Sequence, residues 1–153
     1  MSIAELTPVI ADIPFQLLRS VRQLPQGEFT APALSASRSL RDMLVHLMKA
    51  EQVWVGHVIL RGEKVPLWSA DFISADDLQD AWEPLRKRTV QFFQDATPQQ
   101  LAEVIVDEYE PHITFSVELA LWHFVTHEFF HAGEISLHLG LNGIQPFVPE
   151  IIR

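Results

Sequence analysis

The residues of this sequence best suited to chemistry are its seven histidines, four of which fall within the segment HFVTHEFFHAGEISLH. In an α-helix, residues four apart share a face and lie about 6 Å apart along the axis, so His127 and His131 can converge on one metal ion. His123 extends the same row by one turn. Because it lies about 12 Å along the axis from His131, those two cannot bind one ion together. The helix therefore offers one adjacent pair, either His123 with His127 or His127 with His131.

The flanks of this histidine row predict which way it faces. The row continues to Leu119 in one direction and to Ile135 and Leu139 in the other. Apolar residues at both ends predict that the row faces the protein interior. Imidazoles in an apolar interior need partners for their nitrogens, and a metal ion satisfies one nitrogen on each ligand.

A third ligand is expected from an earlier helix. Met43, His46, Ala50 and Val53 recur at positions i, i+3, i+7 and i+10, which predicts an inward-facing apolar stripe containing one histidine. His46 is therefore the natural partner for the later pair. His57 continues the stripe about three turns away and is a weaker candidate.

The alternative is that the histidines are hydrogen-bonded core residues, which is the common role of a lone histidine such as His57, His112 or His138. The stretch HEFFH, residues 127–131, has the spacing of the zinc-protease pattern HExxH, with Glu128 directly after the first histidine. Spacing alone leaves metal binding and core packing both open.

The first two helices are predicted from proline, serine and glycine positions. We expect an opening helix within residues 2–24, kinked by Pro14. A second helix is expected to begin after Ser35 or Ser37, either of which can cap it, and to end before Gly62.

The middle of the chain carries further capping signals. Ser74 is predicted to start a third helix over residues 75–95, and Thr97 followed by proline predicts a short helix of one or two turns. The β-branched residues within 103–114 predict either an extended crossover or a small strand pair.

The last long helix is expected over residues 117–139, with Ser116 as its cap and Gly140 as its end. Four long helices, with a longer connection before the last, predict an all-α four-helix bundle. An irregular helical domain is the alternative, and in either case residues 1–153 are expected to form a single domain.

Composition narrows the partners and the cellular location. The chain has no cysteine, which excludes disulfides, cysteine zinc sites and a thiolate nucleophile of its own. A net charge of −9 argues against binding to nucleic acid or to anionic membranes. No signal peptide or membrane-spanning segment is evident, so a cytoplasmic location is expected.

Two segments of the sequence together resemble the DinB/YfiT-like superfamily of metal-binding four-helix bundles: SLRDMLVHLMKAEQVW and, much later, LWHFVTHEFFHAGEISLHLGLNGI. The resemblance extends over nearly the whole chain in element order. It implies an up-down-down-up bundle and a metal triad of His46, His127 and His131. It also implies a close helix-packing position at Gly133 and a pocket-lining role for His123.

The sequence departs from the pattern of many relatives close to the second helical histidine. Where those relatives have His, Arg and Gln, this chain has Phe130, Ala132 and Glu134. The ligands are retained while the groups around the pocket differ, so a specific substrate does not carry over from the resemblance.

Three neutral imidazoles leave coordination positions open and suit Zn, Ni or Fe. The resemblance implies a metal-dependent enzyme of thiol-transferase or hydrolase type, acting on a small molecule with a low-molecular-weight thiol as cosubstrate, and a homodimer. Glu134 and His123 are the candidate catalytic residues, whereas Glu51 and Glu128 are expected to be solvated or to lie behind the ligands. The alternative is a non-catalytic metal-binding or stress-response protein.

Overall fold

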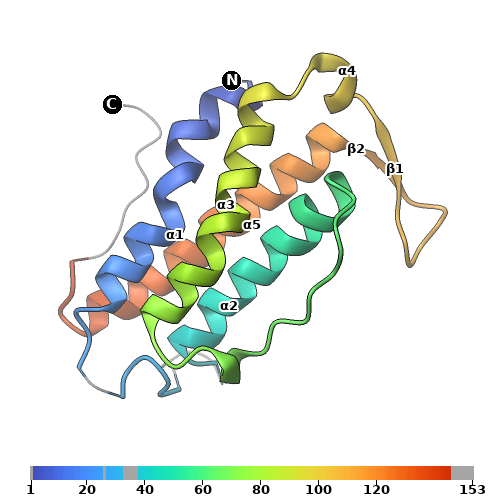
Figure 1. Cartoon of the computed structure of the whole chain (residues 1–153). Coiled ribbons are helices and arrows are strands. Elements are labelled where there is room, and N and C mark those ends of the chain that lie inside the picture. The colour runs from blue at the N-terminus through green and yellow to red at the C-terminus, as the bar shows by residue number, and fades with distance from the viewer. Residues whose placement is uncertain (1, 26, 33–37, 146–153) are drawn as a thin grey trace.

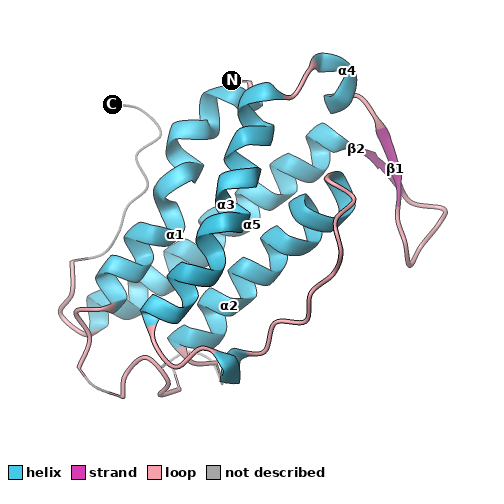
Figure 2. Ribbon diagram, in the orientation of Figure 1, coloured by secondary structure: helices cyan, strands magenta, loops and turns pink. Residues whose placement is uncertain are grey.

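The structure is a computed structural model that describes residues 2–25, 27–32 and 38–145 (Figure 1). This part of the chain is mostly helical, as predicted, with a small antiparallel strand pair beside one end of the helices (Figure 2). In chain order its elements are the 3-10 helix η1 (Ile3–Leu6), α1 (Thr7–Val21), α2 (Leu40–Glu51), the π-helix η2 (Gln52–Ile59), the 3-10 helix η3 (Ser69–Asp71), α3 (Ala75–Asp95), α4 (Pro98–Leu101), β1 (Val104–Val106), β2 (Thr114–Ser116) and α5 (Val117–Leu141).

Helix α1 contains a proline with a structural consequence elsewhere. Pro14 lies inside the helix and has no N–H, so the carbonyl of Ile10, four residues earlier, loses its helical hydrogen-bond donor. The side chain of Arg86 from α3 donates to that carbonyl at 2.7 Å. The proline thus leaves a buried backbone acceptor on α1 that a distant side chain satisfies.

Helix α2 begins later than predicted. Its cap is Ser39, whose hydroxyl accepts from the backbone N–H of Asp42, while the Asp42 carboxylate accepts from the Ser39 backbone N–H. The predicted caps Ser35 and Ser37 lie outside the described residues. The helix continues into η2 and ends before Gly62, as predicted. A Cβ on Gly62 would lie 2.8 Å from the Gly56 carbonyl oxygen, so only glycine fits this close return of the chain.

The middle elements agree with the prediction. Ser74 caps α3 and Thr97 caps α4, each with its hydroxyl accepting from the backbone N–H three residues later. Strands β1 and β2 pair antiparallel, with Val104 opposite Ser116 and Val106 opposite Thr114. Of the two structures predicted for this segment, the small strand pair is therefore the one that forms.

Helix α5 starts at the predicted cap but ends beyond the predicted residue. The Ser116 hydroxyl accepts from the Leu119 backbone N–H, whereas Gly140 lies inside the helix. The chain turns at Gly143, which has a φ of 76°, and the N–H groups of Gly143 and Ile144 donate to the carbonyls of Gly140 and Leu139. This is a Schellman ending, which needs a left-handed residue after the helix, and Gly143 supplies it.

Figure 1 shows α2 and α3 running in the same direction, joined by a segment that travels the length of the helices. That segment, residues 60–74, is the traversing crossover, whereas the prediction placed the crossover before α5. The chain between α3 and α5 is long, but it stays beside one end of the helices as α4 and the strand pair. Parallel neighbours require a connection as long as the helices, whereas antiparallel neighbours can be joined at one end.

Within the described residues, the core between the helices is mainly apolar and contains a buried group of charges. The carboxylates of Glu51 on α2 and Glu128 on α5 flank the Arg86 guanidinium of α3, and each of the three residues is at most 1% exposed. Arg86 Nη2 donates to Glu51 at 2.7 Å and also to Glu128, and the indole N–H of Trp82 donates to Glu51 at 2.5 Å. Of the two alternatives expected for Glu51 and Glu128, solvation is therefore wrong, because both carboxylates are buried against Arg86.

The charges of this cluster depend on one another. Burial alone would lower the pKa of Arg86, but the negative charges of Glu128 and Glu51 raise it above its usual value, so the guanidinium stays charged. Burial raises the pKa of Glu128, and the charge of Arg86 opposes that shift. Two buried carboxylates share one cation. Removing the cation would leave both negative charges buried without a partner, which would strongly destabilise the fold.

We predict that Arg86→Met lowers the free energy of unfolding by about 3–5 kcal/mol, because it leaves two buried carboxylates without a cation. Urea unfolding followed by circular dichroism measures this loss. Arg88→Met on the exposed face of the same helix is the matched control and should change stability by less than about 0.5 kcal/mol. Equal losses in the two variants would show that the cluster has no special structural role.

Candidate metal centre

Three histidines from two helices meet in the structure. His46 comes from α2, and His127 and His131 come from consecutive turns of α5. The ring centroids of the three imidazoles are separated by 4.9 Å, 4.8 Å and 4.5 Å, which describes a nearly equilateral triangle. One ligand atom from each residue lies within 4.8 Å of the others, an arrangement that can hold a metal ion. The pair 127/131 is thus the one that meets His46.

The closest pair of nitrogens has a spacing suited to ligation. The Nε2 atoms of His46 and His127 are 3.1 Å apart. Two nitrogens each about 2.0–2.1 Å from one zinc ion would be about 2.9 Å apart at a right angle and about 3.3 Å apart at the tetrahedral angle. The observed separation lies between these values. A hydrogen bond between two neutral imidazoles has a similar length, but it would leave His131 out of the arrangement.

A carboxylate orients the third histidine. His131 Nδ1 lies 2.6 Å from a carboxylate oxygen of Glu134, one turn further along α5. A carboxylate only accepts, so Nδ1 carries the hydrogen and donates, which leaves the lone pair of Nε2 for a metal ion. Metal-bound histidines commonly have such a carboxylate partner. Glu134 therefore has the geometry of an orienting group, as its spacing from His131 suggested.

The electrostatics of the site favour neutral imidazoles at His46 and His127. Burial, and after it positive charge on His131, His46 and His123, lowers the pKa of His127 to about 4. Burial, and then the charge of His131, also lowers the pKa of His46. Neutral rings at pH 7 keep their lone pairs for a metal ion and need not lose protons to bind it.

The triad lies at the edge of the core and not within it. Its three side chains are half-buried, Leu119 at one end of the row is 58% exposed, and His123 is exposed. On η2, which continues α2, Val53 at the end of the predicted stripe is 37% exposed. The prediction that both rows face the interior is therefore only partly right: the inward faces of α2 and α5 carry Glu51 and Glu128, and the histidines lie beside them.

The remaining predicted position on α5 lies next to the triad. The His123 ring lies 6.2 Å from the His127 ring and 4.7 Å from the Trp54 indole, between centroids. It does not belong to the group of three potential ligands. His123 thus connects the metal centre to an aromatic neighbour on η2.

Two of the departures from the family pattern, Phe130 and Ala132, have different surroundings. Phe130 is 64% exposed and packs against the His131 ring at 5.1 Å between centroids, while Ala132 is completely buried. Gly133 is exposed, and a Cβ built on it would meet nothing within 4 Å. The expectation of a close helix-packing position at Gly133 is therefore wrong, because this face of α5 points away from the other helices.

The other histidines have roles outside the triad. His57 lies 2.8 Å through Nδ1 from the Gly62 carbonyl, His112 is exposed beside Glu110, and His138 is buried near the end of α5. The sequence reasoning did not identify Arg86. The signal was present, because Leu78, Trp82, Thr89 and Phe93 outline a buried face of α3 to which Arg86 belongs.

The sequence matches a protein-family model over most of its length. The model of the DinB family matches residues 11–149, which is most of the chain and includes all three histidines. The chain belongs to the DinB family. A search of curated proteins gave no match. No helix in the described ranges has both the length and the apolar character required to cross a membrane.

We predict that Glu134→Gln in this DinB-family chain weakens metal binding about 10-fold to 100-fold, because the partner of His131 loses its charge. Titration calorimetry with Zn²⁺ on the metal-free protein measures the affinity. Glu118→Gln, an exposed position in the first turn of the same helix, is the matched control and should bind as the parent does. Unchanged affinity in Glu134→Gln would show that the carboxylate does not support the ligand.

The lowered pKa of His127 predicts how stability depends on pH in the metal-free protein. Unfolded histidine has a pKa of about 6.5, so between that value and about 4 the unfolded state binds a proton that the folded state excludes. Stability should therefore fall as the pH is lowered from 6.5 to 5, where most carboxylates are still ionised. Urea midpoints across this range should fall less in His127→Asn, and parallel curves would contradict this origin of the pH dependence.

Proposed function

We propose that this DinB-family chain is a metal-dependent enzyme of thiol-transferase or hydrolase type, with His46, His127 and His131 holding one divalent ion. The observation that carries the proposal is a triad of half-buried histidines at the edge of the core. Within the described residues the ligand group stops at three members. Structural zinc sites are closed by four protein ligands, whereas catalytic sites use three and keep a position for water or substrate.

The chemistry of the ion follows from this ligand set. Imidazole ligands suit Zn, Ni and Fe, so the identity of the metal has to be measured. A bound ion of this kind would lower the pKa of a water or thiol in its open position and make it a nucleophile near neutral pH. Because the chain has no cysteine, any thiol must come from outside, in keeping with a low-molecular-weight thiol cosubstrate.

The residues around the triad limit how protons can be moved. Glu51 and Glu128 are buried and bonded to Arg86, so neither is available as a base. Glu134 already accepts from His131. His123 is exposed beside the triad, and we assign it as the group that can exchange a proton with a substrate.

The engagement of the carboxylates around the triad supports an alternative function. An active site for hydrolysis usually has a carboxylate free to act as a base, and the carboxylates nearest the triad are all engaged. A non-catalytic metal-binding or stress-response protein is therefore the second candidate. A cytoplasmic location, a homodimer and the absence of nucleic-acid or membrane binding are further proposals, which rest on composition and on the family.

We also infer the up-down-down-up order of the family's bundle. The parallel course of α2 and α3 in Figure 1 supports it, since this order has one parallel pair of neighbours in the sequence.

Metal content tests the ligand assignment. We expect about one divalent ion per chain by elemental analysis of the purified protein, and loss of that ion in the triple variant His46→Ala, His127→Ala, His131→Ala. His112→Ala, at an exposed histidine away from the triad, is the control and should keep the metal. Circular dichroism checks that the triple variant folds, and full metal content in a folded triple variant would show that the site is elsewhere.

An activity screen separates the two candidate functions. The metal-loaded protein is incubated with electrophilic and ester substrates, with and without bacillithiol or mycothiol, and turnover is compared with that of the metal-free protein. Metal-dependent turnover with a thiol supports the transferase, and turnover without one supports the hydrolase. Absence of metal-dependent turnover across the screen would favour the non-catalytic alternative.

A further inference from the structure

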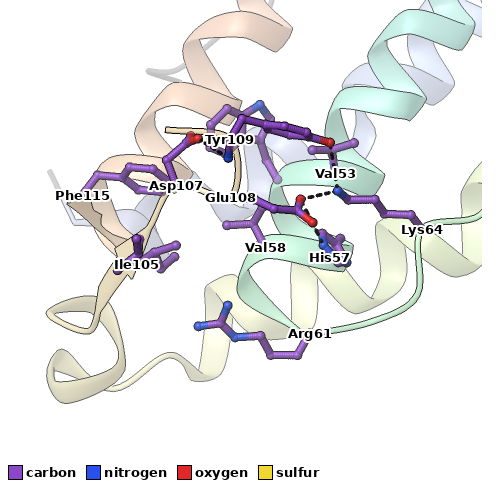
Figure 3. Close-up of a pocket in the computed structure, with 12 residues that line it drawn as sticks. Val53, His57, Val58, Arg61, Lys64, Ile105, Asp107, Glu108, Tyr109 and Phe115 are labelled. Carbon is purple, nitrogen blue, oxygen red and sulfur yellow. Dashed lines mark hydrogen bonds and ion pairs between the residues drawn. The ribbon is translucent and has the colours of Figure 1, made fainter. Parts of the chain in front are cut away.

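A cavity lies beside the metal centre, between η2 and the strand pair (Figure 3). Its volume is about 660 Å³, which is within the range of small-molecule sites. One wall comes from η2 and the segment that follows it, and the other comes from β1, β2 and the turn between them. A π-helix such as η2 is rare and is often found at functional sites.

The interior of the cavity is apolar and aromatic. Val53, Trp54 and Val58 line it from η2, and Ile105 and Phe115 line it from the strands. The Trp54 indole and the Phe115 ring meet edge to face, with centroids 5.8 Å apart. These walls fit a flat or otherwise apolar body, which they would shield from water.

Two cationic side chains of the rim, Arg61 and Lys64, come from one segment after η2. Lys64 donates to the Glu108 carboxylate and, at 3.3 Å, to the Tyr109 hydroxyl, which links this segment to the turn between the strands (Figure 3). These hydrogen bonds raise the pKa of Lys64, so the ammonium stays charged. Arg61 lies nearby, with its guanidinium 3.5 Å from Glu103.

The rim is electrostatically asymmetric. Glu103 and Glu108 are 59% and 58% exposed, and such solvated ion pairs are worth about 0–1 kcal/mol, so a ligand can replace either carboxylate. Asp107 is different, because its carboxylate accepts from the backbone N–H groups of Tyr109 and Glu110 and holds the turn together. Lys64 and Arg61 can therefore exchange their carboxylate partners for a ligand, whereas the Asp107 carboxylate is held by its hydrogen bonds within the turn.

The cavity is connected to the metal centre by two aromatic contacts. Trp54 lines the cavity and also packs against the His123 ring at 4.7 Å, and His123 in turn lies 6.2 Å from the His127 ring. Two rings, Trp54 and His123, would thus separate a molecule in the cavity from the proposed metal ligand His127. The end of such a molecule that is farthest from the metal centre would reach Lys64 at the rim of the cavity.

We propose that this cavity binds a small organic anion with an aromatic or otherwise apolar body, whose anionic group pairs with Lys64 and Arg61. The body lies against Trp54 and Phe115, and the anionic group replaces the exposed carboxylates of Glu108 and Glu103. That this ligand is the substrate of the metal centre rests on the proposed function, whereas binding in the cavity does not.

Two dyes with related apolar bodies test the proposal: the anionic 8-anilinonaphthalene-1-sulfonate and the neutral N-phenyl-1-naphthylamine. We expect both to bind the full chain with a rise in fluorescence. Lys64→Gln should weaken the anionic dye roughly tenfold, the usual effect of losing one hydrogen bond to a charged group, and leave the neutral dye unchanged. Lys87→Gln, at an exposed position on α3, is the charge-matched control and should change neither.

Filling the cavity tests its location. Val53→Trp should weaken both dyes at least tenfold, while Ile73→Trp, at an exposed position outside the cavity, should not. If Val53→Trp unfolds, Val106→Trp on the exposed side of β1 replaces it. Equal effects of the two lysine variants, or unchanged dye binding in a folded filled variant, would overturn the proposal.

The indole N–H signals in a ¹H–¹⁵N spectrum provide an internal control, with Trp54 assigned from a Trp54→Phe variant. The anionic dye should shift the Trp54 signal. The signal of Trp82, which is buried against Glu51, should stay unchanged. A spectrum in which Trp54 does not shift would overturn the proposal. The triple histidine variant should still bind both dyes, so failure of the metal site and failure of the cavity are distinguishable.

Discussion

One guanidinium contacts all four long helices of this chain. Arg86 on α3 donates to the Ile10 carbonyl on α1, to Glu51 on α2 and to Glu128 on α5. The acceptor on α1 exists because Pro14 cannot supply the helical donor. Because a buried carboxylate without its cation is costly, the cluster sets the position of α2 against α5. The separation of the metal ligands on those two helices depends on that position.

The cluster also explains why the histidines lie where they do. Glu128 follows His127 by one residue and Glu51 follows His46 by five, which places the carboxylates about 100° and 140° around their helices from the histidines. When the carboxylates point inward to Arg86, the histidines must lie at the flank. A metal ion held there is anchored by a rigid core and is still accessible to small molecules, as a catalytic site requires.

Elements outside the four long helices shape the surface beside the metal centre. The π-helix η2 and the strand pair form a cavity beside the metal centre, with Trp54 and His123 between the two. Gly62 allows the chain to return closely past η2, and the segment that follows carries the cations of the rim. The long connections are therefore both links between helices and walls of a candidate binding site.

Much of this protein was predictable from sequence because the signals are local. Caps such as Ser74 and Thr97, the strand pair, and the i, i+4 spacing of His127 and His131 each involve residues close together in the chain. The end of α5 was misplaced because Gly140 and Gly143 differ only in backbone conformation, which the residue type does not reveal. Tertiary structure alone decided that Glu51 and Glu128, 35 and 42 residues from Arg86, would share its charge. No local pattern shows which face of a helix a distant cation will occupy, and that face determined whether the histidines were buried or open to a ligand.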